Sequence, residues 1–189
     1  MDSVLKGKNL TIGITGSIAA FKSAELVSKI VQDGSIVQCL MSKGATNFVT
    51  PLTFQTLTGK RVLYETFDIG LVDDPTRIQL AHNTELYLIA PATANSIGKL
   101  AHGIADDVVT SFALAVECPV VVAPAMNMVM LMNKIVQENI QKIKKNGIIV
   151  IEPGKGHLAC GDFGAGRLAE PNEIIRFLEK VLKNGKKKK

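Results

Sequence analysis

Two short polar stretches in this sequence have residue types that suit the binding of an anion. The first is TGSIAA, residues 15–20, whose glycine and serine open an expected helix and offer free backbone N–H groups to a phosphate. In the second, Thr93, Asn95 and Ser96 place three hydrogen-bonding side chains at another helix start. Capping that helix requires only one of them, and the helix dipole also favours an anion. Together the stretches predict a phosphate-binding site, although TGSIAA alone also suits a tight turn.

A third stretch, Pro124 to Asn127, ends an apolar run with an amide. Asn127 suits either a ligand contact or a helix cap. Met128, Met130 and Met132 follow it, and methionines at this spacing are more typical of a packed core than of a cofactor site.

A glycine-rich segment, GKGHLACGDFGAGRLAE at 154–170, has no apolar periodicity. Such a composition is typical of a mobile loop or lid, in which Cys160 would be reachable by a substrate. His157 lies three residues before it, so a Cys/His nucleophile pair is an alternative interpretation. Neither an oxyanion loop nor a third orienting group is evident to support that pair.

The elements that must position these stretches alternate along the chain. Short β-branched runs, among them NLTIGITG, RVLYE, ELYLIAPA and PVVVAPAM, alternate with longer amphipathic runs. In the first amphipathic run Phe21, Val27 and Ile30 recur at helical spacing. The run PVVVAPAM is apolar on both faces, as in a parallel sheet covered by helices on each side. The pattern predicts a doubly wound α/β domain, a three-layer sandwich with its ligands beyond the carboxyl ends of the strands.

Length and composition favour one domain. The chain has 189 residues, 47% of them apolar, which predicts a single domain over 1–184 and a disordered basic tail at 185–189. The net charge of +5 comes mostly from the lysine run 186–189, so no nucleic-acid partner is expected. Three cysteines without ligand spacing predict no metal site and a reducing, cytoplasmic location. No apolar run approaches the roughly 18 residues of a membrane span, so a soluble protein is expected.

Four motifs carry a resemblance to a known family. In order they are GITGSIAA, APATANSIGKLAHGIADD, PAMN and LACGDFGAGRLAEP, and they extend over nearly the whole chain. The sequence resembles the homo-oligomeric flavin-containing cysteine decarboxylases, especially the branch that serves coenzyme A biosynthesis. This resemblance implies a flavodoxin-like (Rossmann-like) fold, FMN as cofactor, and a homotrimer or homododecamer. The implied reaction is FMN-dependent oxidative decarboxylation of a small thiol substrate, most closely of 4′-phosphopantothenoylcysteine to 4′-phosphopantetheine.

The same resemblance implies the site residues. Those expected to hold FMN are Gly16, Ser17, Ile18, Ser42, Thr93, Ala94, Asn95, Ser96 and Ala125. Those expected to contact substrate are Asn127, Met128 and Cys160. Asn127 and Cys160 are also expected to be catalytic, with Cys160 on a lid that converts an enethiol intermediate to product. The presence of Cys160 favours the coenzyme A branch over the peptide-cysteine decarboxylases of lantibiotic assembly.

Two positions depart from the family pattern. The slot of the family's catalytic histidine holds Arg77, and His82, five residues later, points about 140° away on a helix. Arginine cannot act as a general base near neutral pH, although it can hold a carboxylate or phosphate. Leu131 stands where the family usually has an aromatic residue.

Three interpretations of Arg77 stay open, and a fourth possibility concerns the chain as a whole. In the first, the chain is a decarboxylase in which another group, or the flavin, transfers the proton in place of the missing histidine. In the second, the chain is a non-catalytic or complementing subunit completed by a histidine-bearing paralogue. Alternatively it acts on another thiol, such as a peptidyl cysteine in natural-product tailoring. Finally, the chain is compatible with the separated N-terminal part of a bifunctional enzyme.

Overall fold

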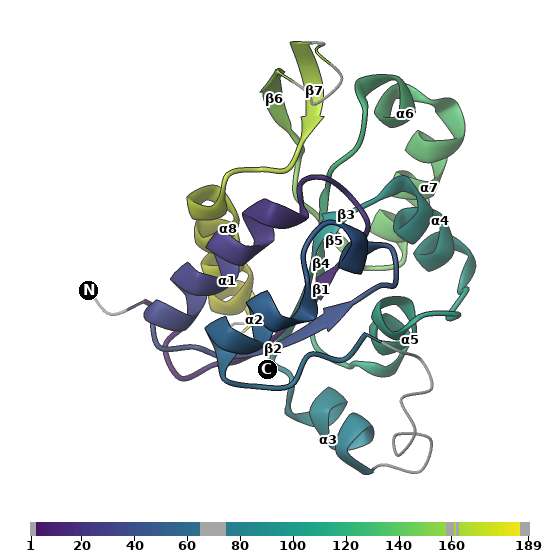
Figure 1. Ribbon diagram of the computed structural model, residues 1–189. Coiled ribbons are helices and arrows are strands. Elements are labelled where there is room, and N and C mark those ends of the chain that lie inside the picture. Colours follow the sequence, from purple (N-terminus) through teal and green to yellow (C-terminus); the bar gives the residue numbers. More distant parts are fainter. Residues whose placement is uncertain (1–2, 65–74, 158–160, 162, 186–189) are drawn as a thin grey trace.

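The fold is built around a five-stranded parallel sheet. The computed structural model describes residues 3–64, 75–157, 161 and 163–185. The strands of the sheet are β1 (Asn9–Ile14), β2 (Ile36–Met41), β3 (Leu86–Ala92), β4 (Val120–Pro124) and β5 (Ile149–Val150). Their order is β2-β1-β3-β4-β5, which is the flavodoxin-like order (Figure 1). The predicted doubly wound α/β class is confirmed.

Helices cover both faces of the sheet, so the predicted three-layer sandwich is also confirmed. One face packs against α1 (Ala20–Gln32), α2 (Pro51–Thr58) and α8 (Pro171–Gly185). The other packs against α3 (Pro75–Asn83), α4 (Ala94–His102), α5 (Val108–Ala115) and α7 (Lys134–Lys145). Two short helices, η1 (Ala45–Asn47) and α6 (Met128–Met132), complete the helical elements of the described residues.

Alternation along the central strands divides the core between the two faces. In β3, Leu86 and Leu88 pack toward α1 and α8, whereas Tyr87 and Ile89 pack toward α5. All seven residues of β3 are buried, as expected for a central strand of a sheet that is covered on both sides. Strand β3 is therefore packed between two separate cores, one on each face of the sheet.

The glycine-rich segment contains regular structure that the sequence did not predict. Strands β6 (Gly154–His157) and β7 (Phe163–Arg167) pair antiparallel and form a hairpin above the carboxyl edge of the sheet (Figure 1). The interpretation as an irregular loop is wrong for these residues. Gly156 and Gly166 adopt φ of 152° and 129°, which explains why glycine replaces the usual β-branched residues in these strands.

Other elements differ in detail. The strand predicted at RVLYE is a single bridge between Leu40 and Leu63 in the described part of that run. Phe21, despite its helical spacing with Val27 and Ile30, is 60% exposed, whereas those two side chains are buried. Helix α8 is an element that the sequence patterns above did not predict. It ends at Gly185, the first residue of the tail predicted at 185–189, so that prediction is wrong for Gly185; the rest of the predicted tail lies outside the described residues. Across the described ranges, no helix combines the length and apolarity needed to cross a membrane.

Candidate flavin and substrate site

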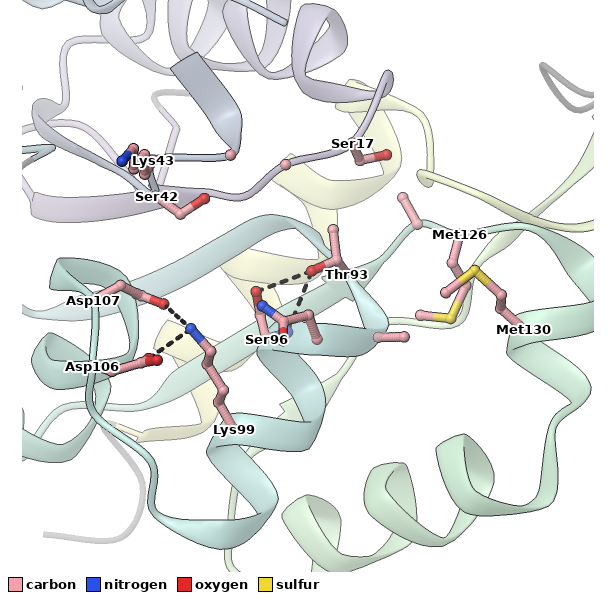
Figure 2. Close-up of a pocket in the computed structure, with 15 residues that line it drawn as sticks. Ser17, Ser42, Lys43, Thr93, Ser96, Lys99, Asp106, Asp107, Met126 and Met130 are labelled. Atoms are coloured by element: carbon pink, nitrogen blue, oxygen red, sulfur yellow. Dashed lines mark hydrogen bonds and ion pairs between the residues drawn. The ribbon is translucent and has the colours of Figure 1, made fainter. Parts of the chain in front are cut away.

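A cavity lies beyond the carboxyl ends of β1 and β3, where the chain leaves the sheet in two directions. Helix α1 follows β1 onto one face, and α4 follows β3 onto the other, which opens a crevice beyond their carboxyl ends. The crevice is a cavity of about 550 Å³ (Figure 2). Its lining residues are Gly16, Ser17, Ser42, Lys43, Gly44, Thr93, Ala94, Asn95, Ser96, Lys99, Asp106, Asp107, Ala125, Met126 and Met130.

Buried hydroxyl groups fix the two loops that flank the crevice. The Thr15 hydroxyl donates to the Pro91 carbonyl at 2.7 Å and accepts from the Thr93 N–H at 3.1 Å. Ser23 of α1 donates to the Ala90 carbonyl at 2.8 Å. Both hydroxyl-bearing residues are buried, so these bonds tie the end of β3 and the following Thr93 to Thr15 and to α1 with little competition from water.

The start of α4 has a formed N-cap and one further polar side chain, that of Asn95, which the cap does not use. Thr93 is the N-cap, and its hydroxyl accepts from the Ser96 N–H at 3.3 Å and lies 3.1 Å from the Ser96 hydroxyl. Asn95 is exposed, lines the cavity, and has no hydrogen bond from its side chain to another described residue. The N-terminal turn of α4 thus presents the Asn95 amide and the helix dipole to the cavity.

Two glycines let the upper wall of the cavity close. A Cβ atom added at Gly16 would lie 2.9 Å from the carbonyl carbon of Gly44, because the two backbones touch. This contact holds the loop after β1 against the loop after β2, which carries Ser42 and Lys43. Glycine is required at position 16 for that approach.

A charged cluster forms one end of the cavity, and the sequence motifs did not predict it. Lys99 bonds Asp106 at 2.6 Å and Asp107 at 2.9 Å (Figure 2). Partial burial acts to lower the pKa of Lys99, but the bonds from both carboxylates outweigh it and raise that pKa. The bond from Lys99 lowers the pKa of Asp106. Since Lys99 is already neutralised, the cation left to meet a ligand in this cavity is Lys43, which has no ion pair among the described residues.

A second cavity of about 380 Å³ adjoins the first and shares Ser17, Ala125 and Met126 with it. Its other lining residues are Ile18, Ala19, Phe21, Lys22, Asn127, His157, Gly166, Arg167 and Leu168. Apolar side chains and an amide are combined here with two cations and an imidazole. A small, partly apolar, anionic ligand is the kind of molecule that such a lining suits.

Glu170 forms ion pairs with both cations of the second cavity. Lys22 bonds Glu170 at 2.7 Å, and Arg167 lies 3.5 Å from the same carboxylate. The hydrogen bond from Lys22 lowers the pKa of Glu170. These contacts connect α1 to the residues that follow β7.

The hairpin packs closely on the chain around Asn127. The Met126 N–H donates to the Gly166 carbonyl at 2.9 Å, and a Cβ atom at Gly166 would overlap the Met126 carbonyl oxygen. A Cβ atom at Gly164 would overlap the sulfur of Met128. Glycines in β7 therefore allow the hairpin to lie directly against the Met126–Met128 segment.

Comparison with known proteins gives the family. Residues 2–183 match the family described as Flavoprotein. The chain belongs to this flavoprotein family. Because the match covers nearly the whole chain, the two cavities lie within the flavoprotein domain itself.

Two curated relatives are similar to this flavoprotein over most of its length. The coenzyme A biosynthesis bifunctional protein CoaBC of Bacillus subtilis is 44% identical over 177 residues, which are 94% of this chain and 44% of that protein. The probable phosphopantothenoylcysteine decarboxylase of Streptococcus mutans is 43% identical over 180 residues, which are 93% of this chain and 99% of that protein. The flavoprotein thus spans less than half the length of its bifunctional relatives.

Solved structures resemble the flavoprotein as well. A cysteine-to-serine variant of PPC decarboxylase complexed with pantothenoylaminoethenethiol is 28% identical, with a TM-score of 0.83 over 94% of this chain and all of that one. A peptidyl-cysteine decarboxylase is 26% identical, with a TM-score of 0.77 over 91% of this chain and 98% of that one. The flavodoxin-like fold is therefore shared with both kinds of decarboxylase.

The structure gathers most of the residues that the resemblance singled out. Eight of the nine residues expected to hold FMN line the first cavity, and Ile18 lines the second instead. Asn127 lines the second cavity, where its side-chain oxygen also accepts from the Val129 N–H at 2.7 Å, so it is a helix cap as well. Among the described residues, those missed by sequence reasoning are Lys43, Gly44, Lys99, Asp106, Asp107, Met126 and Met130 of the first cavity.

Other expectations have different outcomes. The interpretation of the methionines as core residues is wrong for Met130 and Met132, which are 49% and 68% exposed, and Met130 faces the first cavity. Leu131 is buried. Cys160 and the side chain of Arg77 lie outside the described residues, so their predicted roles stay predictions.

Proposed function

We propose that the first cavity holds FMN. The proposal is supported by the convergence of Gly16, Ser17, Ser42, Ala125 and the 93–96 turn on one cavity. The free Asn95 amide, the N-terminus of α4 and the Lys43 ammonium together suit a phosphate group. Solved relatives include FMN-dependent cysteine decarboxylases.

The proposed reaction is the oxidative decarboxylation of a cysteine carboxylate in the second cavity. The single observation that carries it is that Asn127, Lys22 and Arg167 line a cavity directly joined to the flavin cavity. The substrate in this proposal is 4′-phosphopantothenoylcysteine and the product is 4′-phosphopantetheine, a step of coenzyme A biosynthesis. The relative from Streptococcus mutans, matched over its whole length, supports that choice of substrate.

The chemistry that FMN supplies when bound is a two-electron oxidation of the cysteine side chain to a thioaldehyde, which eases loss of carbon dioxide, and later the return of two electrons. The chain's own residues do the rest. Asn127 holds the substrate's carboxylate and amide. Met128, which was expected to contact substrate, lines neither cavity and lies against Gly164 of the hairpin. Lys22 and Arg167 attract the anionic substrate into the cavity. Cys160 delivers a proton to the enethiol that decarboxylation leaves.

The assembly and location belong to the same proposal. We infer a homo-oligomer, a trimer or a dodecamer of trimers, in the cytoplasm. An alternative is a complementing subunit completed by a histidine-bearing paralogue, because Arg77 stands in the usual histidine slot. Decarboxylation of a peptidyl cysteine is the other alternative, favoured by the similarity to the peptidyl-cysteine decarboxylase.

Anaerobic incubation of the flavin-loaded chain with 4′-phosphopantothenoylcysteine tests the proposed reaction. We expect the unmodified chain to form 4′-phosphopantetheine, and the Cys160→Ser variant to release the enethiol, which is lighter by two hydrogen atoms. The reason is that the enethiol cannot be reduced without a proton donor. Mass spectrometry distinguishes the two products.

Other results of this incubation select among the alternatives. Turnover by an Arg77→His variant but not by the unmodified chain would favour a complementing subunit. Turnover by neither, together with turnover of a peptide ending in cysteine, would favour peptide tailoring and exclude the coenzyme A assignment.

The flavin phosphate site has its own test. Asn95→Ala is expected to weaken FMN binding by about 10- to 100-fold, because a hydrogen bond to a charged group contributes about 1.5–3 kcal/mol. Quenching of flavin fluorescence on titration of apoprotein measures the affinity. Gln141→Ala, an exposed change in α7 that touches neither cavity, is the control and should bind FMN normally. Undiminished affinity in Asn95→Ala would exclude Asn95 from the phosphate site.

A further inference from the structure

One imidazole faces the proposed substrate. Of the described residues that line the two cavities, His157 is the only histidine. It shares the second cavity with Asn127, which is proposed to hold the substrate, and with Ser17, which borders both cavities. An imidazole is the side chain that most often serves as a general base in enzymes.

The hairpin holds the ring of His157 in place. His157 is the cross-strand partner of Phe163, and their rings pack edge to face with centroids 5.2 Å apart and planes 78° apart. Phe163 is otherwise 70% exposed. This ring contact restricts the orientation of the imidazole.

The charges around His157 suit the formation of a thiolate. The charged residues lining the same cavity are Lys22 from α1 and Arg167 from β7, and Glu170 bonds both of them. The two cations exceed the one carboxylate, so the cavity has a net positive charge. Positive charge next to a thiol favours its ionised form.

The other residues considered as a general base for the substrate's thiol are less suitable than His157. Arg77 remains protonated and cannot accept a proton. His82 lies on α3, and it lines neither cavity of its own chain. Helix α3 precedes β3 and lies at the far end of the sheet from the hairpin (Figure 1).

We propose that His157 is a catalytic residue that removes the proton from the substrate's thiol. The S–H bond breaks, an N–H bond forms on the imidazole, and the electron pair stays on sulfur as a thiolate. His157 thereby takes a role that Arg77 cannot fill. This assignment rests on the proposed function, because it requires a thiol substrate beside Asn127.

Substitution of His157 in the flavin-loaded full chain tests the assignment. His157→Gln is expected to lower kcat by at least about 100-fold, the usual contribution of a general base, with KM and flavin content unchanged. Lys155→Gln, in the same hairpin but outside both cavities, is the matched control and should retain kcat. Free imidazole should restore part of the activity of His157→Ala, which a purely structural role would not allow.

A double variant distinguishes proton transfer by His157 from a packing role. The Arg77→His variant has an imidazole at the family's usual histidine position, so adding His157→Gln to it should cost much less activity than His157→Gln costs in the unmodified chain. An equal loss in both backgrounds, without rescue by imidazole, would overturn the assignment to His157. Equal kcat in His157→Gln and the unmodified chain would also overturn it, while leaving the decarboxylase intact. Absence of turnover by the unmodified chain and by Arg77→His would instead overturn the proposed function.

Discussion

Gly16→Ala is expected to weaken FMN binding by about 10- to 100-fold. The added Cβ atom would lie 2.9 Å from the Gly44 carbonyl carbon, and backbone on both sides leaves no flexible side chain to move away. Overpacking of this kind typically costs about 1–3 kcal/mol, and every 1.4 kcal/mol is about tenfold in affinity. Relief of the overlap would separate the loops after β1 and β2, which form the upper wall of the first cavity, the proposed FMN site.

Gly98→Ala is the control because Gly98 lies in α4 and lines neither cavity. A Cβ atom at Gly98 would lie 3.7 Å from the side-chain nitrogen of Asn139, which is an ordinary contact. Fluorescence titration of both apoproteins with FMN measures the difference, and thermal unfolding confirms that both are folded. Similar FMN affinities for the two variants would mean that the Gly16–Gly44 contact does not shape the site.

The parts of the site that the sequence predicts are those whose signals are local. Thr93, Asn95 and Ser96 are adjacent in the chain, and hydroxyl and amide residues at a helix start have a known physical role. The alternation of strands and helices then places their turn beside the loop after β1, since both follow carboxyl ends of parallel strands. The fold class was predictable for this reason, and so was the part of the lining formed by Gly16, Ser17, Thr93, Asn95 and Ser96. Ser42, Ala94 and Ala125 were expected only from the family resemblance.

The roles of the missed residues depend on contacts between separate structural elements. Lys99 is one helical turn beyond Ser96, but its role depends on Asp106 and Asp107, which reach it across the connection between α4 and α5. Nothing in a run of residues indicates that such a lysine is neutralised. The β6–β7 hairpin was also missed, because its glycines serve close packing against Met126 and Met128, whereas strand prediction relies on β-branched residues.

Tyr87→Ala is expected to lower the free energy of unfolding by about 3–5 kcal/mol, the usual cost of truncating a buried aromatic residue. Tyr87 is fully buried in β3, and its ring packs edge to face on Phe112 of α5 at 4.9 Å between centroids. Its hydroxyl donates to the Val109 carbonyl at 2.9 Å. Tyr87→Phe, which loses only that bond, should cost about 1 kcal/mol, and urea unfolding of the apoproteins measures both.

A double-mutant cycle with Gly13 tests the packing that underlies this difference. A Cβ atom at Gly13 would lie 2.5 Å from the Tyr87 hydroxyl oxygen and 2.9 Å from a Val109 methyl carbon. Gly13→Ala alone should therefore cost about 1–3 kcal/mol. The cost should fall in Tyr87→Phe, because the nearest atom is gone, but should not vanish, because the Val109 methyl remains. Costs that add to within about 0.5 kcal/mol would contradict a contact between positions 13 and 87. Gly13 lies just before the loop that carries Gly16, so this packing also fixes the position of the carboxyl end of β1 next to the first cavity.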